Sequence, residues 1–214
     1  MGDGPEDPAL QRPRLVKTEA LHLCIRPVTP EDREALRQGF QAISPETTYR
    51  RFFVSAFSPS DQELEYLTEV DGRNHVAIGA EDCTQTPPKG MGVARYVRLP
   101  DEPTVAEAAV VVIDAYQRQG IGSLLLAALS KRAADCGLKT FRGYVLRNNS
   151  GVLDVLRALG ASEASSKDGV LELDIPVVGR LEALPDRPEL KRLRWAWSTL
   201  AAAEVGECAG GTEK

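Results

Sequence analysis

The chain has 214 residues, of which 43% are hydrophobic and 27% are charged, so we expect one domain with a core of its own. The formal net charge is -5, from 26 Lys and Arg against 31 Asp and Glu, and no basic stripe dominates, which argues against nucleic acid as a partner. No secretory signal opens the chain and no apolar run approaches the roughly 20 residues of a membrane span, so we expect a soluble cytoplasmic protein.

Cysteine and histidine are sparse and scattered. The chain holds four cysteines and two histidines, none of them in a C-x-x-C pair: Cys24, Cys83, Cys136, Cys208, His22 and His75. Such spacing argues against a zinc site and against the disulfide framework of a small secreted domain. We therefore predict no bound metal and four free or buried thiols in a reducing compartment.

The first half of the chain predicts a disordered arm, three helices and four strands. Residues 1–18 are rich in Pro, Gly and charge, which is typical of disorder. Thr29, Ser44 and Ser60 each precede a helical pattern and are the predicted N-caps. The expected elements are a strand at 21–26, helices at 30–42, from 45 and from 61, and strands at 75–81, 91–99 and 105–113.

The second of these helices carries three aromatic residues beside two arginines. Tyr49, Phe52 and Phe53 are expected to point inward, with Arg50 and Arg51 outward or at a rim. The set could line the mouth of a ligand site, or it could be a core stripe with a solvated basic face. The pattern favours neither interpretation.

A strand, a glycine-bearing loop and a helix follow one another in the middle of the chain. The apolar, β-branched run from Ala108 to Ile113 predicts a buried strand, and residues 123–136 continue as a helix. Backbone N–H groups at the start of a helix lack intrahelical partners and favour an anion, as does the helix dipole. The intervening loop, with Gly120 and Gly122, therefore predicts a phosphate-binding site. No Gly-Lys-Ser/Thr follows it, which excludes a Walker loop.

The last third predicts two more strands and two more helices. A right-handed crossover leads to a strand at 140–146, parallel to the strand at 105–113. A helix begins near Asn149 and is followed by a strand at 170–175. The expected fold class is α/β (α+β): a mixed, mostly antiparallel sheet with helices on both faces and one parallel pair.

The tail, residues 177–214, differs in character from the rest. It contains an amphipathic helix at about 189–205, with Trp195 and Trp197 in its middle, and a Gly-rich end expected to be disordered. This helix could pack on the domain, contact another protein or a second copy of the chain, or cover the active site. We favour packing on the domain and leave a homodimer open.

The motif Gln117-x-x-Gly120-x-Gly122 resembles the acyl-CoA signature Q/R-x-x-G-x-G/A of the GNAT N-acetyltransferases. The resemblance covers roughly residues 21–175 and implies a GNAT-like fold over 19–176. Within that superfamily, SPETTYRRFF at 44–53, VARYV at 93–97, Glu107, and V-L-x-x-N at 145–149 are similar to the catalytic domain of bacterial Pat-type protein-lysine acetyltransferases. Those enzymes modify acyl-CoA synthetases and similar metabolic proteins.

The resemblance implies acetyl-CoA as cosubstrate, no metal, and a set of residues that holds the cosubstrate. The backbone of Val110, Val111 and Val112 would pair with the pantetheine arm like an added strand. Backbone amides of the loop would hold the diphosphate, with polar contacts from Arg118 or Ser123, and Asn149 would contact the pantetheine or ribose side. The implied loop residues are Gln117, Arg118, Gln119, Gly120, Ile121 and Gly122.

Glu107 is the residue implied to act as general base. A lysine amine has a pKa of ~10.4 and must lose a proton before it attacks a thioester. Many family members also carry a tyrosine, as proton donor to the thiolate, near the position of Leu156, but no tyrosine lies between Asn149 and Gly160 here. Tyr116 and Tyr144 are candidates that nothing in the sequence supports.

Three functions follow from these residues. The first is acetyl transfer to a protein lysine, the second is acetyl transfer to a small-molecule amine, and the third is a non-catalytic acyl-CoA-binding regulator. The first two share every cosubstrate residue and differ in the acceptor cleft, expected at residues 44–70 and 98–106. Glu107 argues against the third.

Overall fold

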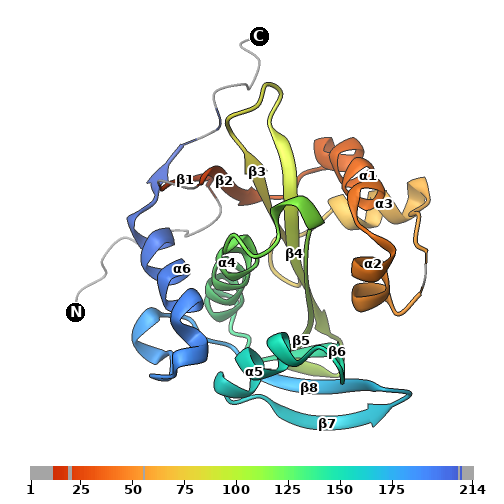
Figure 1. Ribbon diagram of the computed structural model, residues 1–214, viewed down its shortest axis with the longest axis vertical. Helices are drawn as coiled ribbons and strands as arrows, with labels where there is room; N and C mark the ends of the chain where they lie inside the picture. Colours follow the sequence, from red (N-terminus) through yellow and green to blue (C-terminus); the bar gives the residue numbers. More distant parts are fainter. Residues whose placement is uncertain (1–11, 19–20, 55, 207, 209–214) are drawn as a thin grey trace.

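The computed structural model describes residues 12–18, 21–54, 56–206 and 208. A nine-stranded sheet runs through the molecule in the order β7-β8-β6-β5-β4-β3-β2-β1-β9 (Figure 1). Neighbouring strands are antiparallel except for β5 and β6, which confirms the predicted mixed sheet with one parallel pair. The strands are β1 Arg14–Lys17, β2 His22–Pro27, β3 His75–Asp82, β4 Lys89–Leu99, β5 Glu102–Val112, β6 Thr140–Leu146, β7 Ser162–Lys167, β8 Val170–Pro176 and β9 Glu204–Val205.

The helices of the described residues begin close to the predicted positions. They are α1 Arg33–Ala42, α2 Pro45–Phe52, α3 Asp61–Thr68, α4 Ile121–Asp135, α5 Ser150–Ala158 and α6 Lys191–Ala202, with 3-10 turns η1 Pro30–Asp32, η2 Asp114–Tyr116, η3 Leu181–Ala183 and η4 Pro188–Leu190. The predicted caps Ser44 and Ser60 are confirmed. Their hydroxyl oxygens accept hydrogen bonds from the backbone amides of Thr47 and Glu63, with N to Oγ distances of 3.2 and 3.3 Å. No helix in the described residues combines the length and apolar composition that a membrane crossing requires.

Helices cover both faces of the sheet, as predicted. In Figure 1, α1, α2 and α3 lie on one side of the central strands and α4, α5 and α6 on the other. The core is concentrated under α4, where Leu124, Leu125 and Leu129 are fully buried. Tyr96 of β4 and Phe141 of β6 lie in the same core, with their ring centroids 6.0 Å apart. Burial of these apolar side chains holds α4, and with it the loop that precedes α4, against the sheet.

The C-terminal helix packs on the domain, which confirms the favoured interpretation of the tail. Leu193, Ala196 and Trp197 of α6 are buried and belong to the main core, and α6 runs beside α4 (Figure 1). The chain then adds β9 to the edge of the sheet by pairing with β1. The tail up to Val205 is therefore part of the same folded unit as the predicted domain, whereas its Gly-rich end, residues 209–214, lies outside the described residues.

One prediction about the edges of the sheet is wrong, and the edge strand β7 was not predicted. Residues 14–17, within the stretch expected to be disordered, form β1, while residues 1–11 lie outside the described part of the chain. Residues 162–167 form β7, although all six are polar or small and all are exposed. Both short strands form by pairing with the unpaired backbone groups of a neighbouring strand. Neither shows the apolar alternation from which a strand is predicted.

The prediction of four free thiols is also wrong. Cys83 and Cys208 form a disulfide, although 125 residues separate them along the chain. Successive pairing of β9, β1, β2 and β3 brings their Cα atoms to 5.2 Å, a distance that a sequence pattern does not reveal. Cys24 and Cys136 are free. Burial, with the nearby charge of Glu81, raises the pKa of Cys24 to about 11, so its thiol stays protonated near neutral pH.

Candidate functional site

The two parallel strands stay paired over three residues and then separate. Val105, Ala106 and Glu107 of β5 pair with Thr140, Phe141 and Arg142 of β6. Both strands continue, β5 to Val112 and β6 to Leu146, without a further pair between them among the described residues. The edge of β5 after Glu107 therefore has no strand beside it, and its backbone groups are free to pair with an extended ligand.

The hydrogen-bonding direction of this edge follows from β4. The amide of Ile113 donates to the carbonyl of Met91, at 2.9 Å, on the β4 side. Because backbone groups alternate between the two sides of a strand, those of Val111 also face β4, and those of Val110 and Val112 face the open side. Of the three valines predicted to bind pantetheine, two thus present backbone groups to the opening.

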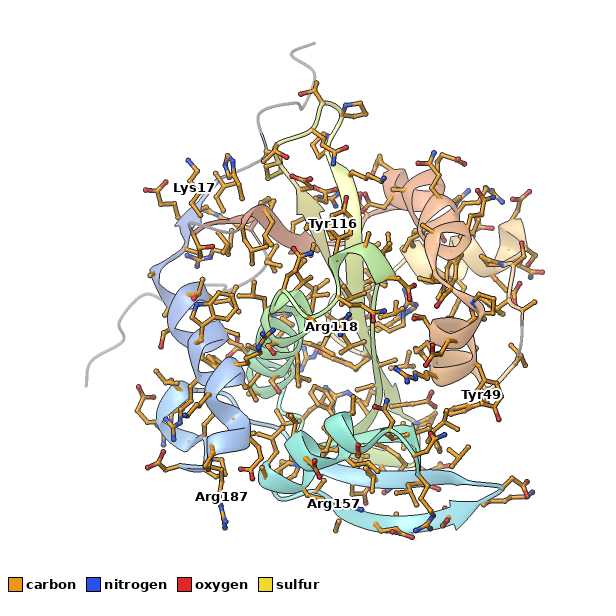
Figure 2. All side chains as sticks on the ribbon, in the orientation of Figure 1. Lys17, Tyr49, Tyr116, Arg118, Arg157 and Arg187 are labelled. Carbon is orange, nitrogen blue, oxygen red and sulfur yellow. A yellow bond between two sulfur atoms is a disulfide. The ribbon has the colours of Figure 1, made fainter. Side chains whose placement is uncertain are left out.

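The loop between β5 and α4 presents amide groups that the protein leaves unpaired. Gly120 is the residue before α4, has φ 96°, and no side chain caps the helix there. In the described structure, the amides of residues 118–122 donate no hydrogen bond to another protein group. Several N–H groups and the positive end of the helix dipole therefore meet at one place, beside Arg118 (Figure 2), which is the arrangement that binds a phosphate.

Gln117 and Asp114 tie this loop to its surroundings. The Gln117 side-chain amide donates to the Val112 carbonyl at 3.0 Å and to the Thr47 hydroxyl at 3.1 Å. Its own backbone amide donates to the Asp114 carbonyl at 3.2 Å, so Gln117 is engaged within the protein, whereas the following amides are free. Gln117 therefore shapes the loop through its side chain.

Asp114 joins the loop to the start of α2, a role that the sequence did not indicate. Its carboxylate accepts hydrogen bonds from the Ser44 amide, the Ser44 hydroxyl and the Thr47 hydroxyl, each at 2.8 Å. Desolvation acts to raise the pKa of Asp114, but these hydrogen bonds outweigh it and hold the pKa below its usual value. Asp114 thus stays ionised at neutral pH and connects the loop before α4 with α2.

Two further predicted residues lie on this side of the sheet. Asn149 is the residue before α5, directly after β6, and its side chain makes no hydrogen bond in the described structure. The amide of Ser123 donates to the Gly120 carbonyl within the first turn of α4. Asn149 therefore comes after the end of β6, and the loop at residues 117–122 comes after the end of β5, where the two strands have separated.

Glu107 lies on the opposite face of the sheet from α4. Ala106 is buried in the core, so the alternation of the strand turns the exposed Glu107 side chain toward α2. Arg142, its register partner on β6, is engaged elsewhere, because its guanidinium pairs with Glu102 at 2.6 Å and Asp174 at 2.9 Å. The Glu107 carboxylate makes no hydrogen bond or ion pair with another described residue, so it is open to a ligand.

Charged and aromatic residues surround this carboxylate. Burial lowers the pKa of Arg51, on α2, and the negative charge of Glu107 opposes that decrease. Burial and the like charge of Arg51 lower the pKa of Arg95 to about 10. Tyr144 follows Arg142 on the same face of β6, and burial and the charges of Glu172 and Glu107 raise its pKa. Tyr144 is thus the tyrosine that shares a face with Glu107, whereas Tyr116 packs against the core.

Two interpretations of the aromatic residues of α2 were left open, namely that they line a ligand site or that they pack in the interior. The structure supports each for different residues. Phe52 packs with Phe40 and Phe57 at centroid distances of 5.7 and 4.5 Å, so it belongs to a half-buried cluster of three aromatic rings. Tyr49 is 49% exposed, contrary to its predicted inward direction, and the charge of Glu107 acts on the pKa of Arg51. The face of α2 thus contributes both to packing and to the surroundings of Glu107.

The described residues bring three side chains of metal-ligand type together at one place, remote from Glu107. Cys24, Glu81 and Cys208 have ligand atoms within 4.8 Å of one another. Cys208 is bonded to Cys83, and Glu81 is paired with Arg26. Neither group is free to serve as a ligand in this structure.

Comparison with known proteins agrees with this geometry. The model of the Acetyltransferase (GNAT) family matches residues 41–161. The chain is 38% identical over 168 residues to Acetyltransferase Pat of Mycolicibacterium smegmatis, covering 78% of this chain and 49% of that protein. It is 30% identical over 139 residues to Acetyltransferase PA5475 of Pseudomonas aeruginosa, covering 65% of this chain and 74% of that protein. The chain thus spans about half the length of the first relative.

A solved structure supports the same fold. The GNAT domain of S. lividans PAT superposes with a TM-score of 0.68 at 27% identity, covering 80% of this chain and 99% of that domain. An acetyltransferase of the GNAT family from Streptococcus pneumoniae, at 19% identity and a TM-score of 0.59, has the same fold.

Proposed function

The chain belongs to the Acetyltransferase (GNAT) family, and we propose that it transfers the acetyl group of acetyl-CoA to a lysine side chain of a metabolic protein such as an acyl-CoA synthetase. One observation carries the proposal. Glu107, a carboxylate without a protein partner among the described residues, sits where β5 and β6 separate, and β5 leads directly into the loop of free amides. A base, an open strand edge and an anion site thus follow one another along the chain.

In this proposal, the cosubstrate supplies the activated acetyl group as a thioester. The free amides of residues 118–122 hold the diphosphate, and the open backbone groups of Val110 align the pantetheine arm together with the Val112 amide, since the Val112 carbonyl already accepts from Gln117. Asn149 and Arg118 offer side chains that make no other hydrogen bond in the described structure. These contacts fix the thioester beside the start of the open edge.

Glu107 acts on the acceptor. It takes a proton from the lysine ammonium group, whose usual pKa is ~10.4, and so frees the lone pair that attacks the thioester carbonyl. The new C–N bond forms, the C–S bond breaks, and the departing thiolate takes up the second proton lost by the nitrogen. Tyr144, protonated at neutral pH and on the same face as Glu107, relays this proton: its hydroxyl gives a proton to the thiolate and regains one from the nitrogen.

The surroundings of Glu107 favour a protein acceptor over a small amine. Tyr49, Tyr66 and Tyr144 are 49%, 56% and 42% exposed, and they lie on α2, α3 and β6, around the Arg51 and Arg95 charges. Exposed aromatic side chains of this kind are enriched where proteins dock.

The experiment incubates the protein with acetyl-CoA and a purified acyl-CoA synthetase, and follows thiol release together with lysine acetylation by mass spectrometry. A panel of small amines, comprising a polyamine, an amino acid and an aminoglycoside, is assayed in parallel. We expect acetylation of the synthetase and at most background release with the panel. Turnover with a small amine alone would favour the second function, and acetyl-CoA binding without transfer to any acceptor would favour the third.

The two glycines that flank α4 allow a matched test of the loop. Gly120 and Gly137 both have positive φ, 96° and 77°, so alanine is strained at either position, by about 1–2 kcal/mol. A Cβ at Gly120 would lie 2.7 Å from the ring of Trp195, whereas a Cβ at Gly137 meets nothing within 4 Å. We expect Gly120→Ala to raise the Kd for acetyl-CoA at least about tenfold and Gly137→Ala to leave it unchanged, measured by calorimetry. Equal Kd values for the two variants would place the diphosphate elsewhere.

A further inference from the structure

Helix α6 lies outside residues 41–161, which match the family model, yet it touches the loop of free amides twice. The Arg192 guanidinium donates a hydrogen bond from Nη1 to the carbonyl oxygen of Arg118 at 2.5 Å. The ring of Trp195, one turn later on the same face of α6, lies against Gly120. Both loop residues have positive φ, 61° for Arg118 and 96° for Gly120.

These contacts determine the direction in which the backbone N–H of Gln119 points. In a trans peptide, the carbonyl of one residue and the N–H of the next point in opposite directions within one plane. By holding the Arg118 carbonyl toward α6, Arg192 turns the Gln119 N–H away from α6. That N–H has no acceptor in the described part of the protein, so it is available to a phosphate oxygen.

The conformation that Arg192 holds is one that the chain does not favour by itself. Arg118 has a side chain and positive φ, a combination that most residues avoid. The Trp195 ring occupies the space beside Gly120, which keeps that segment from collapsing toward α6. Ordering a loop when it binds an anion costs conformational entropy, and this cost is smaller when the loop already has its bound shape.

We propose that α6 is a positioning element for the diphosphate of the cosubstrate, acting through Arg192 on the Arg118–Gln119 peptide and through Trp195 on Gly120. The inference rests on the proposed function, because it takes the diphosphate of acetyl-CoA as the anion. Arg192 also brings a cation to the loop, which adds to the attraction for the phosphates. Neither residue contacts the acceptor side of the sheet, so neither is assigned a role in proton transfer.

The test compares two arginines of the same helix. Arg194 also donates to a backbone carbonyl, that of Leu184 at 2.9 Å, but this carbonyl lies outside the loop. We expect Arg192→Met to raise the Kd for acetyl-CoA about tenfold, as for the loss of one hydrogen bond from a charged donor, and Arg194→Met to change it less than about twofold. Trp195→Ala is expected to weaken binding similarly, and Trp195→Phe to restore most of it.

A second ligand separates positioning from a general structural effect. S-acetyl-pantetheine carries the thioester and the arm but no diphosphate, so we expect ligand-observed NMR to show the same Kd for it in wild type and Arg192→Met. Because Arg192 is exposed, this variant is expected to fold, and its melting temperature serves as the check. Weakened binding of both ligands would indicate general damage to the domain and contradict the proposal.

Three results would overturn the inference. If Arg192→Met and Trp195→Ala bind acetyl-CoA as wild type does, α6 does not position the loop, and the proposed function stands. If they bind more tightly, α6 obstructs the site instead of supporting it. If wild type itself binds no acetyl-CoA, the proposed function fails, and the inference fails with it.

Discussion

Glu107→Gln is expected to lower kcat for acetyl transfer by about 100-fold to 10,000-fold, the range that a general base contributes. Glutamine keeps the size and hydrogen-bonding geometry of the side chain but cannot take up the proton. The Kd for acetyl-CoA should stay within about twofold of wild type, because Glu107 lies on the acceptor face and the loop amides lie beyond the far end of β5. Steady-state kinetics and calorimetry measure the two effects separately.

The pH dependence of the variant adds an independent readout. Without a base, the rate depends on the fraction of lysine that is already neutral, which rises about tenfold per pH unit below the lysine pKa of ~10.4. We therefore expect the logarithm of the acetylation rate of Glu107→Gln to rise with pH at a slope near one, whereas the rate of the wild type rises less steeply.

Glu163→Gln provides the control for Glu107→Gln, since it removes a similarly exposed carboxylate from β7. We expect its kcat to remain within about twofold of wild type. Unchanged kcat in Glu107→Gln would remove Glu107 from the mechanism, and parallel loss of acetyl-CoA binding would assign it a structural role instead.

Trp197→Ala is expected to lower the free energy of unfolding by about 3–5 kcal/mol, the usual cost of truncating a buried tryptophan. Trp197 is 6% exposed and belongs to the core that joins α6 to α4, whereas Trp195 is 37% exposed. Trp195→Ala should therefore cost no more than about 1 kcal/mol. Denaturant unfolding, monitored by circular dichroism, gives both values.

Trp197→Phe distinguishes packing from hydrogen bonding at the same position. The indole N–H of Trp197 is buried without an acceptor among the described residues, so its removal loses no hydrogen bond. We expect Trp197→Phe to cost less than about 1.5 kcal/mol, because the aromatic ring still fills most of the space. Equal unfolding energies for wild type and Trp197→Ala would show that α6 is not part of the fold.

The same packing predicts the effect of deleting residues 177–214. It removes Leu190, Leu193 and Trp197 and leaves the surface of α4 beneath them exposed to water. We expect the truncated protein to be insoluble or unfolded, judged by its yield in the soluble fraction. A soluble, folded and more active truncation would instead identify the tail as a cover.

The sequence by itself determined the parts of this protein that depend on neighbouring residues. The strand at Ala108–Ile113, the glycines at the start of α4 and the caps Ser44 and Ser60 are local signals, because turn geometry and amphipathic spacing act over a few residues. The right-handed crossover rule then placed β6 parallel to β5. The motif around Gln117 was enough to identify the family, which the family match confirms.

Only the tertiary structure decided which distant residues meet. The Cys83–Cys208 disulfide, the tie from Asp114 to Ser44 and the contact of Arg192 with Arg118 join residues between 70 and 125 positions apart. The disulfide depends on the order of the strands and the other two contacts on which face a helix covers, and none of the three leaves a periodic trace in the chain. The loop could therefore be predicted as an anion site from its own residues, but the groups of α2 and α6 that contact it became visible only in the tertiary structure.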